Sequence, residues 1–579
     1  MMSDFTPIPR VPSEPPEFLE ETLSHALPLI DVPDGSGVMV QGSIAEGLGD
    51  PYSDIDFLLV APGDQPLPIM PTNIRKEERR IEIWFRSSRT VIEHAQRLHR
   101  IDPTSEEALR SLSSHDFEKY QRFAHGAPIR NKHLLEDLQR QHDAQRFAVL
   151  ASAWWRMHAA DAVWRARVAL RLGRTEDAVG LARRGVETAA KAWVAERGDT
   201  YVSERFLPAQ LLRVPGGTAV HERLEPLLRP GRLERPATYV QACAEEASAL
   251  GVSLRDDSDK SVLARTPAEV TRWDIGPTAC VLRGSKDLFA LSAEAALLWP
   301  TLAEGACLAD VIEANPELDR SAALAALGDL HRHGLLELTP RSGTGGWRLG
   351  HGLPRSAAGG CRVTPHGPRF DQPPPGHVHW IPIAPGRFAS AGANLLWSGV
   401  LVENSREDFV GAAERDRWPQ AARALRRMVE QACNLVLSGF GVEPLPESTH
   451  LVAALREVAN LPDGFAEAAR ALLYSPAREE AEVRGLYADV EAFLERIPEE
   501  LQDPNVRRSH QSIASWLQVM ALGFGWIRLA VHLDAPVPLE EARDLLTHAH
   551  GGKQARVLDQ SAGEGRGDAD RRLEVKPAD

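Results

Sequence analysis

The stretch from residue 42 to 57, GSIAEGLGDPYSDIDF, constrains the fold more than any other part of the chain. An apolar run at 38–40 precedes it, and a second apolar run begins at Ile55 after a polar loop. This order predicts a strand, a turn with a short helix, and a second strand. Because side chains alternate along a strand, Asp54 and Asp56 are expected to point to the same face.

Two carboxylates on one face can hold divalent metal, as two-metal phosphoryl chemistry requires. Gly42 lets a backbone amide approach a phosphate closely, and Ser43 can donate its hydroxyl. A helix that begins here would direct its positive end at the same oxygens. We therefore expect a bound triphosphate, and assign Gly42, Ser43 and Ser53 to the nucleotide-binding set.

The spacing of these residues resembles that of a known family. Gly-Ser, the step of ten residues from Ser43 to Ser53, and the Ser-Asp-Ile-Asp that follows resemble the polymerase-beta-like nucleotidyltransferase superfamily, and its kanamycin nucleotidyltransferase group in particular. The resemblance covers about the first quarter of the chain. It implies transfer of a nucleoside monophosphate from a nucleoside triphosphate, expected to be ATP, to a hydroxyl with release of pyrophosphate. Mg²⁺ is the implied metal.

The family also has a third carboxylate on a neighbouring strand. Residues 80–85, RIEIWF, alternate as a strand should and offer Glu82, with Ile81 and Ile83 toward the core. Asp54, Asp56 and Glu82 are thus the expected catalytic and metal-binding residues. One departure is Glu46, in the loop where many members carry Arg. We expect Glu46 to lower the affinity for triphosphate and assign it no binding role.

Length and composition limit the other possibilities. With 579 residues and 43% hydrophobic content, the chain is expected to form about three or four domains. A net charge of −15 argues against a polymerase or nucleic-acid coat, because phosphate contacts need clustered Lys and Arg. The five cysteines are widely spaced, odd in number and without a CxxC pair. Neither a disulfide framework nor a zinc site is expected, which favours the reducing cytoplasm.

Neither a signal peptide nor a membrane span is expected from the sequence. The N-terminus, MMSDFTPIPRVPSEPPEF, lacks the pattern of a signal peptide and is expected to be a flexible leader. The most apolar stretch, 513–527, is interrupted by Gln518 and stops at Arg528, short of the roughly 20 residues of a membrane span. We interpret it as a buried helix and expect no membrane partner.

Two parts of the chain are expected to be helical bundles, 136–267 and 385–550. Trp154 and Trp155 lie on an apolar helical stripe of the first, which favours core packing over base stacking. Residues 178–198 match 421–441 without a gap, which predicts a possible duplication. The seven identical positions are Ala178 and Ala421, Arg183 and Arg426, Arg184 and Arg427, Val186 and Val429, Glu187 and Glu430, Ala189 and Ala432, and Gly198 and Gly441.

The first copy follows the predicted catalytic domain and ends in Glu-Arg-Phe-Leu-Pro at 204–208. It resembles the HEPN-like bundles found beside small nucleotidyltransferases. Some of these are ribonucleases with an Arg followed by a His, a spacing shared by Arg543 and His548, but such pairs arise by chance in this composition. In antibiotic-modifying relatives a carboxylate of the helical domain deprotonates the acceptor. Glu187 is a candidate, the alternative being a salt-bridged helix surface.

Between the bundles, residues 268–350 have the pattern of a winged helix. Apolar runs at 279–282 and 288–291 flank a turn, three short helices follow, and Leu335 begins a closing strand. The third helix, SAALAALGDLHRHG, carries Ala and Leu where base-reading side chains would stand. DNA readout is therefore the weaker interpretation.

The same region resembles the PqqD-like peptide-recognition domains. The resemblance rests on Leu-Ser-x-x-Ala-x-x-Leu-Trp, the following Gly and the terminal Gly-Leu-Leu. It implies that the leader of a ribosomally synthesised peptide adds a strand to the hairpin at 279–291, whose edge we expect to be open.

The expected fold is multidomain α+β. It comprises a small mixed-sheet nucleotidyltransferase domain at 1–135, the bundle at 136–267, the winged helix at 268–350, a linker at 351–384, the second bundle at 385–550 and a disordered tail at 551–579. The expected function is nucleotidyl transfer to a precursor peptide bound by the winged helix. The alternatives are transfer to a small molecule such as an aminoglycoside, and a regulatory protein that binds DNA.

Overall fold

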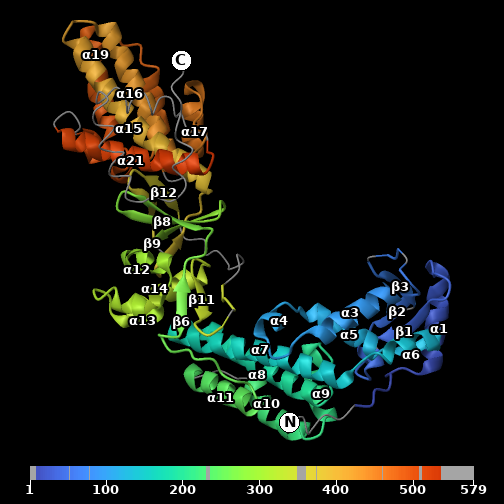
Figure 1. The fold of residues 1–579 in the computed structure, drawn as a ribbon. Helices are drawn as coiled ribbons and strands as arrows, with labels where there is room; N and C mark the ends of the chain where they lie inside the picture. Colours follow the sequence, from blue (N-terminus) through green and yellow to red (C-terminus); the bar gives the residue numbers. More distant parts are fainter. Residues whose placement is uncertain are drawn as a thin grey trace, which may run out of the picture. The chain divides into compact units, whose positions relative to one another are not determined.

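The computed structural model describes residues 8–535, apart from 51–52, 65, 69, 77–78, 230–234, 344, 349–359, 373–374, 459–460 and 508–511. The predicted tail, and the pair Arg543 and His548, lie outside the described residues. The chain forms two compact units, and each is described by itself (Figure 1). Unit 1 comprises Met1–Ala264, Cys307–Asp310 and Leu338–Trp347; unit 2 comprises Arg265–Ala306, Val311–Glu337 and Arg348–Asp579.

Unit 1 begins with a small mixed sheet whose strand order is β3-β4-β2-β1-β5. Strands β2 and β4 are parallel, and the other pairs are antiparallel. The predicted strand, short helix and strand are confirmed as β1, α2 and β2. The bounds are β1 Gly37–Gln41, α2 Gly42–Ala45, β2 Ile55–Ala61, β3 Thr72–Lys76, β4 Arg79–Ser87 and β5 Ala127–Arg130.

Both faces of this sheet are covered, because each strand contributes apolar side chains alternately to two cores. Phe57 and Leu59 of β2 pack with Ile81 and Ile83 on one side, as predicted for β4. Leu58 of β2 and its alternate neighbours pack against helices on the other side. The helices of this part are α1 Pro16–Ala26, η1 Leu27–Leu29, α3 Ser88–Arg100, α4 Glu106–Arg110, α5 Ser114–Ala124 and α6 Lys132–Gln139.

The predicted flexible leader is ordered in its second half. Pro16 starts helix α1, where a proline costs no hydrogen bond, and Leu19 and Leu23 are buried in the sheet core. Arg10 pairs with the buried Glu46 at 2.7 Å. The prediction was wrong for these residues because composition alone does not reveal a single long-range ion pair.

The first bundle follows and contains the two predicted core tryptophans. Trp154 and Trp155 on α7 are each 6% exposed and belong to one hydrophobic core with Phe117 and Phe147. Helices α7 and α8 are antiparallel neighbours joined by a short turn at Gly173. The elements are α7 Ala144–Arg171, α8 Thr175–Glu196, η2 Glu204–Phe206, α9 Leu207–Arg213, α10 Gly217–Leu228 and α11 Pro236–Ala249.

The hairpin and helices predicted for 268–350 are present. Ser292 caps α12 by accepting a hydrogen bond from Ala295 N, and Gly305 ends it with φ +80°. The elements are β7 Val270–Ile275, β8 Thr278–Arg283, β9 Asp287–Leu291, α12 Ala293–Glu304, α13 Leu308–Glu313, α14 Arg320–Arg332 and β11 Glu337–Pro340. The closing strand β11 does not join the hairpin, but a separate sheet with β6 Val262–Arg265 and β10 Ala306–Cys307.

The expectation of an open hairpin edge is wrong. The sheet has the order β14-β9-β8-β7, so β8 is covered by β7 and β9 by β14 Val378–Trp380. In this pairing Val378 lies opposite Leu291 and Trp380 opposite Phe289. The chain thus supplies a strand where we expected a peptide ligand.

The predicted linker at 351–384 is also partly wrong. It contains β14 and a hairpin formed by β12 Cys361–Thr364 and β13 Gly367–Phe370. Val363 is fully buried and packs in one core with Phe388 and Trp526. Short strands that bury a single apolar side chain leave little periodic signal in a Gly- and Pro-rich sequence.

The second bundle repeats the element order of the first. Two long helices are followed by a short 3-10 turn and three shorter helices in both places. The elements are α15 Pro385–Ala413, α16 Trp418–Gly439, η3 Ser448–His450, α17 Leu451–Glu457, α18 Phe465–Leu473 and α19 Glu480–Leu494, then η4 Glu499–Leu501, α20 Pro504–Arg507 and α21 Ile513–His532.

Details of the two series also correspond. Arg-Phe-Ala occupies the third to fifth positions of both long first helices, α7 and α15. Gly216 and Gly464 are both in the left-handed region before α10 and α18. Segments 178–198 and 421–441 are both helical up to the terminal glycine region. The duplication itself stays a prediction, now supported by six matching elements in order.

Helix α21 is the one helix of the described residues that is long and apolar enough to cross a membrane by length and composition. In its most apolar window, Ala514–His532, 33% of the residues are buried inside the protein. Trp526 and Leu529 pack with Phe388 of α15. The predicted helix is therefore present, with one face packed in unit 2.

Candidate active site at the edge of the five-stranded sheet

The three predicted carboxylates come together where β2 begins. The parallel register of β2 and β4 places Asp56 opposite Glu82, and Asp54 lies two residues earlier. The side chains of Asp56 and Glu82 are 14% and 16% exposed, whereas that of Asp54 is 42% exposed. The site thus has two half-buried carboxylates side by side and a third at its rim.

Two arginines neutralise this cluster. Arg80 on β4 donates to Asp54 and lies 3.1 Å from Glu82 Oε1. Arg122 on α5 lies 3.7 Å from Asp56 Oδ2 and 2.6 Å from Glu118 Oε1. Strand alternation could have revealed Arg80, two positions before Glu82. Arg122 reaches the site only through the packing of α5, for which the sequence holds no local signal.

The electrostatic environment of Asp56 favours its neutral form. Burial is the main cause and raises the pKa of Asp56 to about 6. Arg122 opposes the increase, and the neighbouring Glu82 and Asp54 add to it. Repulsion among close carboxylates is what a divalent cation would relieve.

Gly42 is placed where no side chain fits. Its φ is +74°, and a Cβ added there would collide with the carboxylate of Asp56. Close contact between the turn and the carboxylate therefore requires glycine. Ser43 is buried in the first turn of α2, a helix of only four residues, so the predicted helix dipole is small.

Ser53 takes part in the turn before β2. Its hydroxyl accepts from Asp50 N at 2.9 Å and donates to Asp50 Oδ1 at 3.2 Å. Arg79 Nη2 donates to Ser53 O at 2.8 Å. These contacts fix the chain just before Asp54, and the nucleotide-binding role of Ser53 stays a prediction.

Among the residues that the structure describes, no group of three or more His, Cys, Asp or Glu side chains is arranged to hold a metal ion. The carboxylate of Asp54 is turned to Arg80. The donor set nevertheless fits a hard divalent cation, because Asp54, Asp56 and Glu82 offer three carboxylates close together, the oxygen ligands that such a cation prefers. They are the residues that would hold Mg²⁺.

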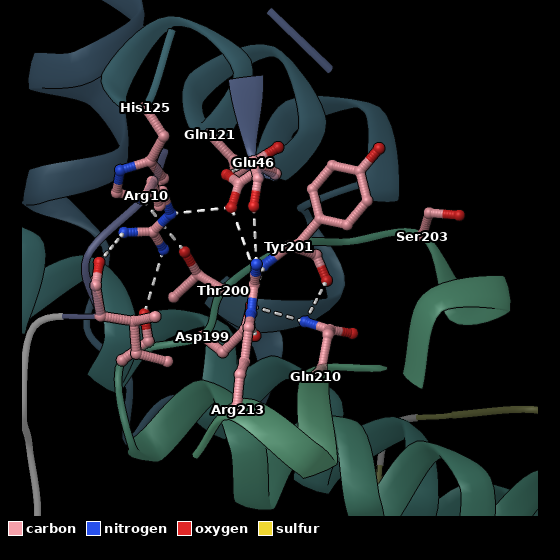
Figure 2. A network of polar contacts seen from close by, with 12 residues as sticks. Arg10, Glu46, Gln121, His125, Asp199, Thr200, Tyr201, Ser203, Gln210 and Arg213 are labelled. Atoms are coloured by element: carbon pink, nitrogen blue, oxygen red, sulfur yellow. Dashed lines mark hydrogen bonds and ion pairs between the residues drawn. The ribbon is translucent and has the colours of Figure 1, made fainter. Parts of the chain in front are cut away.

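Glu46, to which the sequence analysis assigns no binding role, is only 1% exposed. Its contacts hold the loop after α2 in place. Figure 2 shows that Arg10, Gln121 and Arg213 converge on it. Arg10 Nε lies 2.7 Å and Arg213 Nη2 lies 3.3 Å from Glu46 Oε2, and Arg213 Nη1 donates to Glu46 O at 2.7 Å. Because Arg213 ends α9, these bonds tie the loop of the site to the first bundle.

The same network continues into the bundle (Figure 2). Arg213 Nη2 donates to Asp199 Oδ1 at 2.8 Å, and Gln210 Nε2 donates to the same oxygen at 2.7 Å. Lys191, which is fully buried, donates to Gln210 and to Tyr201 O. Burial of a charged side chain without partners would destabilise the folded protein. In this network Lys191, Asp199 and Arg213 each have several hydrogen-bonding partners.

Glu187 makes no hydrogen bond or ion pair with the three carboxylates among the residues that the structure describes. This half-buried residue of α8 has a raised pKa because of burial, and its charged neighbours are Glu204, Arg183, Arg184 and Lys191. None of these is among the charged neighbours of Asp56, which are Arg122, Glu82, Asp54 and Glu118. A role for Glu187 as general base stays a prediction.

Comparison with known proteins bears on the N-terminal part. Residues 29–100 match the family model of a nucleotidyltransferase domain. This range contains Gly42, Ser43, Asp54, Asp56 and Glu82, together with strands β1 to β4 of the sheet.

A solved structure, a nucleotidyltransferase-like protein from Exiguobacterium sibiricum 255-15, is similar at 14% identity and a TM-score of 0.24. The match covers 40% of this chain and 73% of that one. A comparison with curated proteins gave no match.

Proposed function

We propose that the chain transfers a nucleoside monophosphate from a nucleoside triphosphate, expected to be ATP, to an acceptor hydroxyl. The observation that carries the proposal is the register of Asp56 opposite Glu82, with Gly42 in contact with the Asp56 carboxylate. The family match of residues 29–100 supports the same reaction class.

Each residue has a defined part in this proposal. Asp54, Asp56 and Glu82 would hold Mg²⁺, which when bound would offset the negative charge of the phosphates. Gly42 and Ser43 would contact the phosphates. Arg80 has to release Asp54 and Glu82 when the site is loaded.

The proposed reaction is a displacement at the α-phosphorus of the triphosphate. The acceptor oxygen bonds to this phosphorus while the bond to the bridging oxygen of the β-phosphate breaks. Pyrophosphate leaves with that electron pair, and the hydroxyl proton passes to solvent or to a base.

The experiment is transfer of label from each α-labelled triphosphate by the full chain with Mg²⁺. Asp54→Asn and Asp56→Asn keep the shape of the side chains and remove a charge, so transfer is expected to fall at least 100-fold without loss of folding. Asp64→Asn is the control, because Asp64 is 67% exposed and pairs only with Arg89 among the contacts described. Near-normal transfer by either site variant would contradict the assignment.

For the acceptor, we propose a ribosomally synthesised peptide bound by the part of unit 2 that contains β7, β8, β9, α12 and α14. Since β14 covers β9, the peptide would pair with β7, at the other end of the four-stranded sheet. Strand pairing provides backbone hydrogen bonds, and neighbouring apolar pockets provide specificity. The support is the exposed polar pattern of β7, with Thr271 and Asp274 open to solvent.

The second candidate acceptor is a small molecule such as an aminoglycoside. DNA binding is less well supported. Asp329 on α14 is acidic and already accepts a hydrogen bond from His377 N at 2.7 Å.

Titration of labelled precursor peptide and labelled duplex DNA against the full chain at low and high salt separates these acceptors. Peptide binding that changes little with salt is expected, whereas DNA binding weakens steeply as salt rises. Salt-dependent duplex binding without peptide binding would contradict the peptide proposal and leave the test of nucleotidyl transfer unaffected.

A further inference from the structure

A pocket of about 720 Å³ lies in unit 1, where the start of α5 meets α7 and α8. It is separate from the carboxylate site. Ser114 at the start of α5 lines the pocket, whereas Arg122 near the end of the same helix faces Asp56. At 1.5 Å per residue these positions are about 12 Å apart along the helix axis.

Two tryptophans form an aromatic wall. The rings of Trp154 and Trp155 are perpendicular neighbours, with centroids 4.7 Å apart and an interplanar angle of 73°. His158 lies 4.2 Å from the Trp154 ring, and Trp154 Nε1 donates to Leu112 O at 3.2 Å. Both indoles belong to the core, as predicted, yet both also line the pocket. Such a wall suits a flat aromatic ligand.

Two acidic and two basic side chains line the pocket, Asp161, Glu204, Arg165 and Arg184, and Arg184 pairs with Glu204 at 3.6 Å. Asp161 is already shared by Arg110, at 2.8 Å, and Arg255, at 2.9 Å. Arg165 is half-buried and makes no hydrogen bond or ion pair with any residue that the structure describes, and its Nε is shielded from solvent. Burial lowers the pKa of Arg165, which reflects the cost of this position. Asp161 opposes this decrease without a direct contact, and a guanidinium that lacks a direct hydrogen-bond partner is a ready partner for an anion.

The second bundle provides an internal comparison. Arg406 stands at the same distance from the start of α15 as Arg165 from the start of α7. Arg406 pairs with Glu403 at 3.1 Å and with Glu491. Where α7 has its two tryptophans, α15 has Leu395 and Leu396. The free cation and the aromatic wall therefore occur in the first bundle and not at the matching positions of the second.

We propose that this pocket binds a flat aromatic molecule that carries a phosphate or carboxylate, with its ring against Trp154 and Trp155 and its anionic group on Arg165. The inference does not depend on nucleotidyl transfer, because it concerns a separate set of residues.

The test is calorimetric titration of the full chain with four probes: phenyl phosphate, phenol, inorganic phosphate and AMP. Phenyl phosphate is expected to bind at least tenfold more tightly than phenol or inorganic phosphate, because only it has both groups. AMP that binds more tightly than phenyl phosphate identifies a nucleotide ligand, and the reverse order identifies another aromatic anion. Equal affinity for phenyl phosphate and inorganic phosphate would overturn the proposal.

Two variants make the test specific. Arg165→Gln should weaken phenyl phosphate binding at least tenfold, whereas Arg406→Gln, the same change at the matching position, should leave it unchanged. Arg165→Gln removes a half-buried cation without a partner, so its Tm should not fall, whereas Arg406→Gln leaves two glutamates unpaired and should lower Tm. Wild-type affinity in Arg165→Gln would overturn the proposal.

Arg165→Lys is a second variant, in case Arg165→Gln does not fold. It keeps the charge and loses the planar fork, so it should bind phenyl phosphate with intermediate affinity. If Arg165→Lys bound phenyl phosphate as tightly as the wild type, the proposed contact between the guanidinium and the anion would be contradicted.

Discussion

At the scale of single residues, the contact between Gly42 and Asp56 shows how tightly the site is built. The turn after β1 has a positive φ at Gly42, and the space for a Cβ is taken by the Asp56 carboxylate. The same position allows a phosphate to approach the backbone. One residue therefore determines both the shape of the turn and the place of the carboxylate.

Gly42→Ala is expected to reduce transfer by more than tenfold and to lower Tm, since the added methyl group forces the turn away from Asp56. Gly180→Ala is the matched control. Gly180 lies in the interior of α8 with no atom near the added Cβ, so alanine should be neutral or stabilise by about 0.5–1 kcal/mol. The measurements are labelled-nucleotide transfer and thermal unfolding. Normal transfer by Gly42→Ala would show that the turn does not have to touch Asp56.

Part of the carboxylate cluster could be predicted from local sequence, because strand alternation places Asp54 and Asp56 on one face. Glu82 was expected from the family resemblance, and its place opposite Asp56 depends on the parallel register of β2 and β4. The partners of Glu46 could not be predicted in this way. Arg213 lies 167 positions away along the chain, and a contact of that range depends on how two domains pack. From the sequence alone, Glu46 is expected only to lower the affinity for triphosphate, and its contacts with Arg10 and Arg213 are visible only in the folded chain.

At the scale of elements, helix α5 joins the sheet domain to the first bundle through a cluster of histidines. The hydroxyl of Tyr120 lies 2.7 Å from His99 Nε2 and 2.7 Å from His142 Nδ1. The rings of His125 and His142 are in edge contact. Burial lowers the pKa of His142 to about 4 and that of His125 well below its usual value.

This cluster predicts a loss of stability in acid. An unfolded histidine takes up a proton near pH 6.5, whereas folded His142 stays neutral until about pH 4. The unfolded state therefore binds more protons between these values, and stability falls as pH decreases through this window. His142→Gln removes one such group and should reduce the fall in Tm between pH 7 and pH 4.5.

The control is His115→Gln, because the side chain of His115 is 57% exposed on the same helix. It should leave the pH dependence of Tm as in the wild type. Since His125 remains in His142→Gln, part of the acid effect should persist. An unchanged pH profile in His142→Gln would contradict the assignment.

Element type was predictable wherever a pattern ran over several residues. The hairpin of β8 and β9, the cap at Ser292 and the end of α12 at Gly305 follow from such patterns. Strand β14 has only three residues, and its role depends on pairing with β9, almost ninety positions earlier. Pairing between strands so far apart in the sequence depends on tertiary structure, which the local sequence does not encode.

At the scale of the whole molecule, two bundles with the same series of elements make different contacts at matching positions. In the first, Arg213 at the end of α9 reaches both Asp199 and Glu46. In the second, Arg456 near the end of α17 is exposed and pairs with Glu467. The series of elements is repeated in both bundles. The ion pair between Arg213 and Glu46, which connects a bundle to the sheet domain, is made by the first bundle.

Arg213→Met is expected to destabilise the protein by roughly 3–5 kcal/mol, because it leaves Asp199 without its main charged partner in a buried site. Arg456→Met is the control and should change stability by no more than about 1 kcal/mol, as for other exposed ion pairs. Thermal unfolding of both variants measures the difference. Equal Tm values would show that the buried network does not hold the two parts together.

The strand β14 has a practical consequence for dividing the protein into pieces. A fragment that ends at residue 350, where the sequence suggested a domain boundary, would lose β14 and the side chains of α15 and α21 that cover Cys280, Leu282 and Leu288. It would expose a bare strand edge together with an apolar sheet face, the combination that promotes self-association. Expression of this region as a well-behaved fragment therefore calls for a chain that continues through α21.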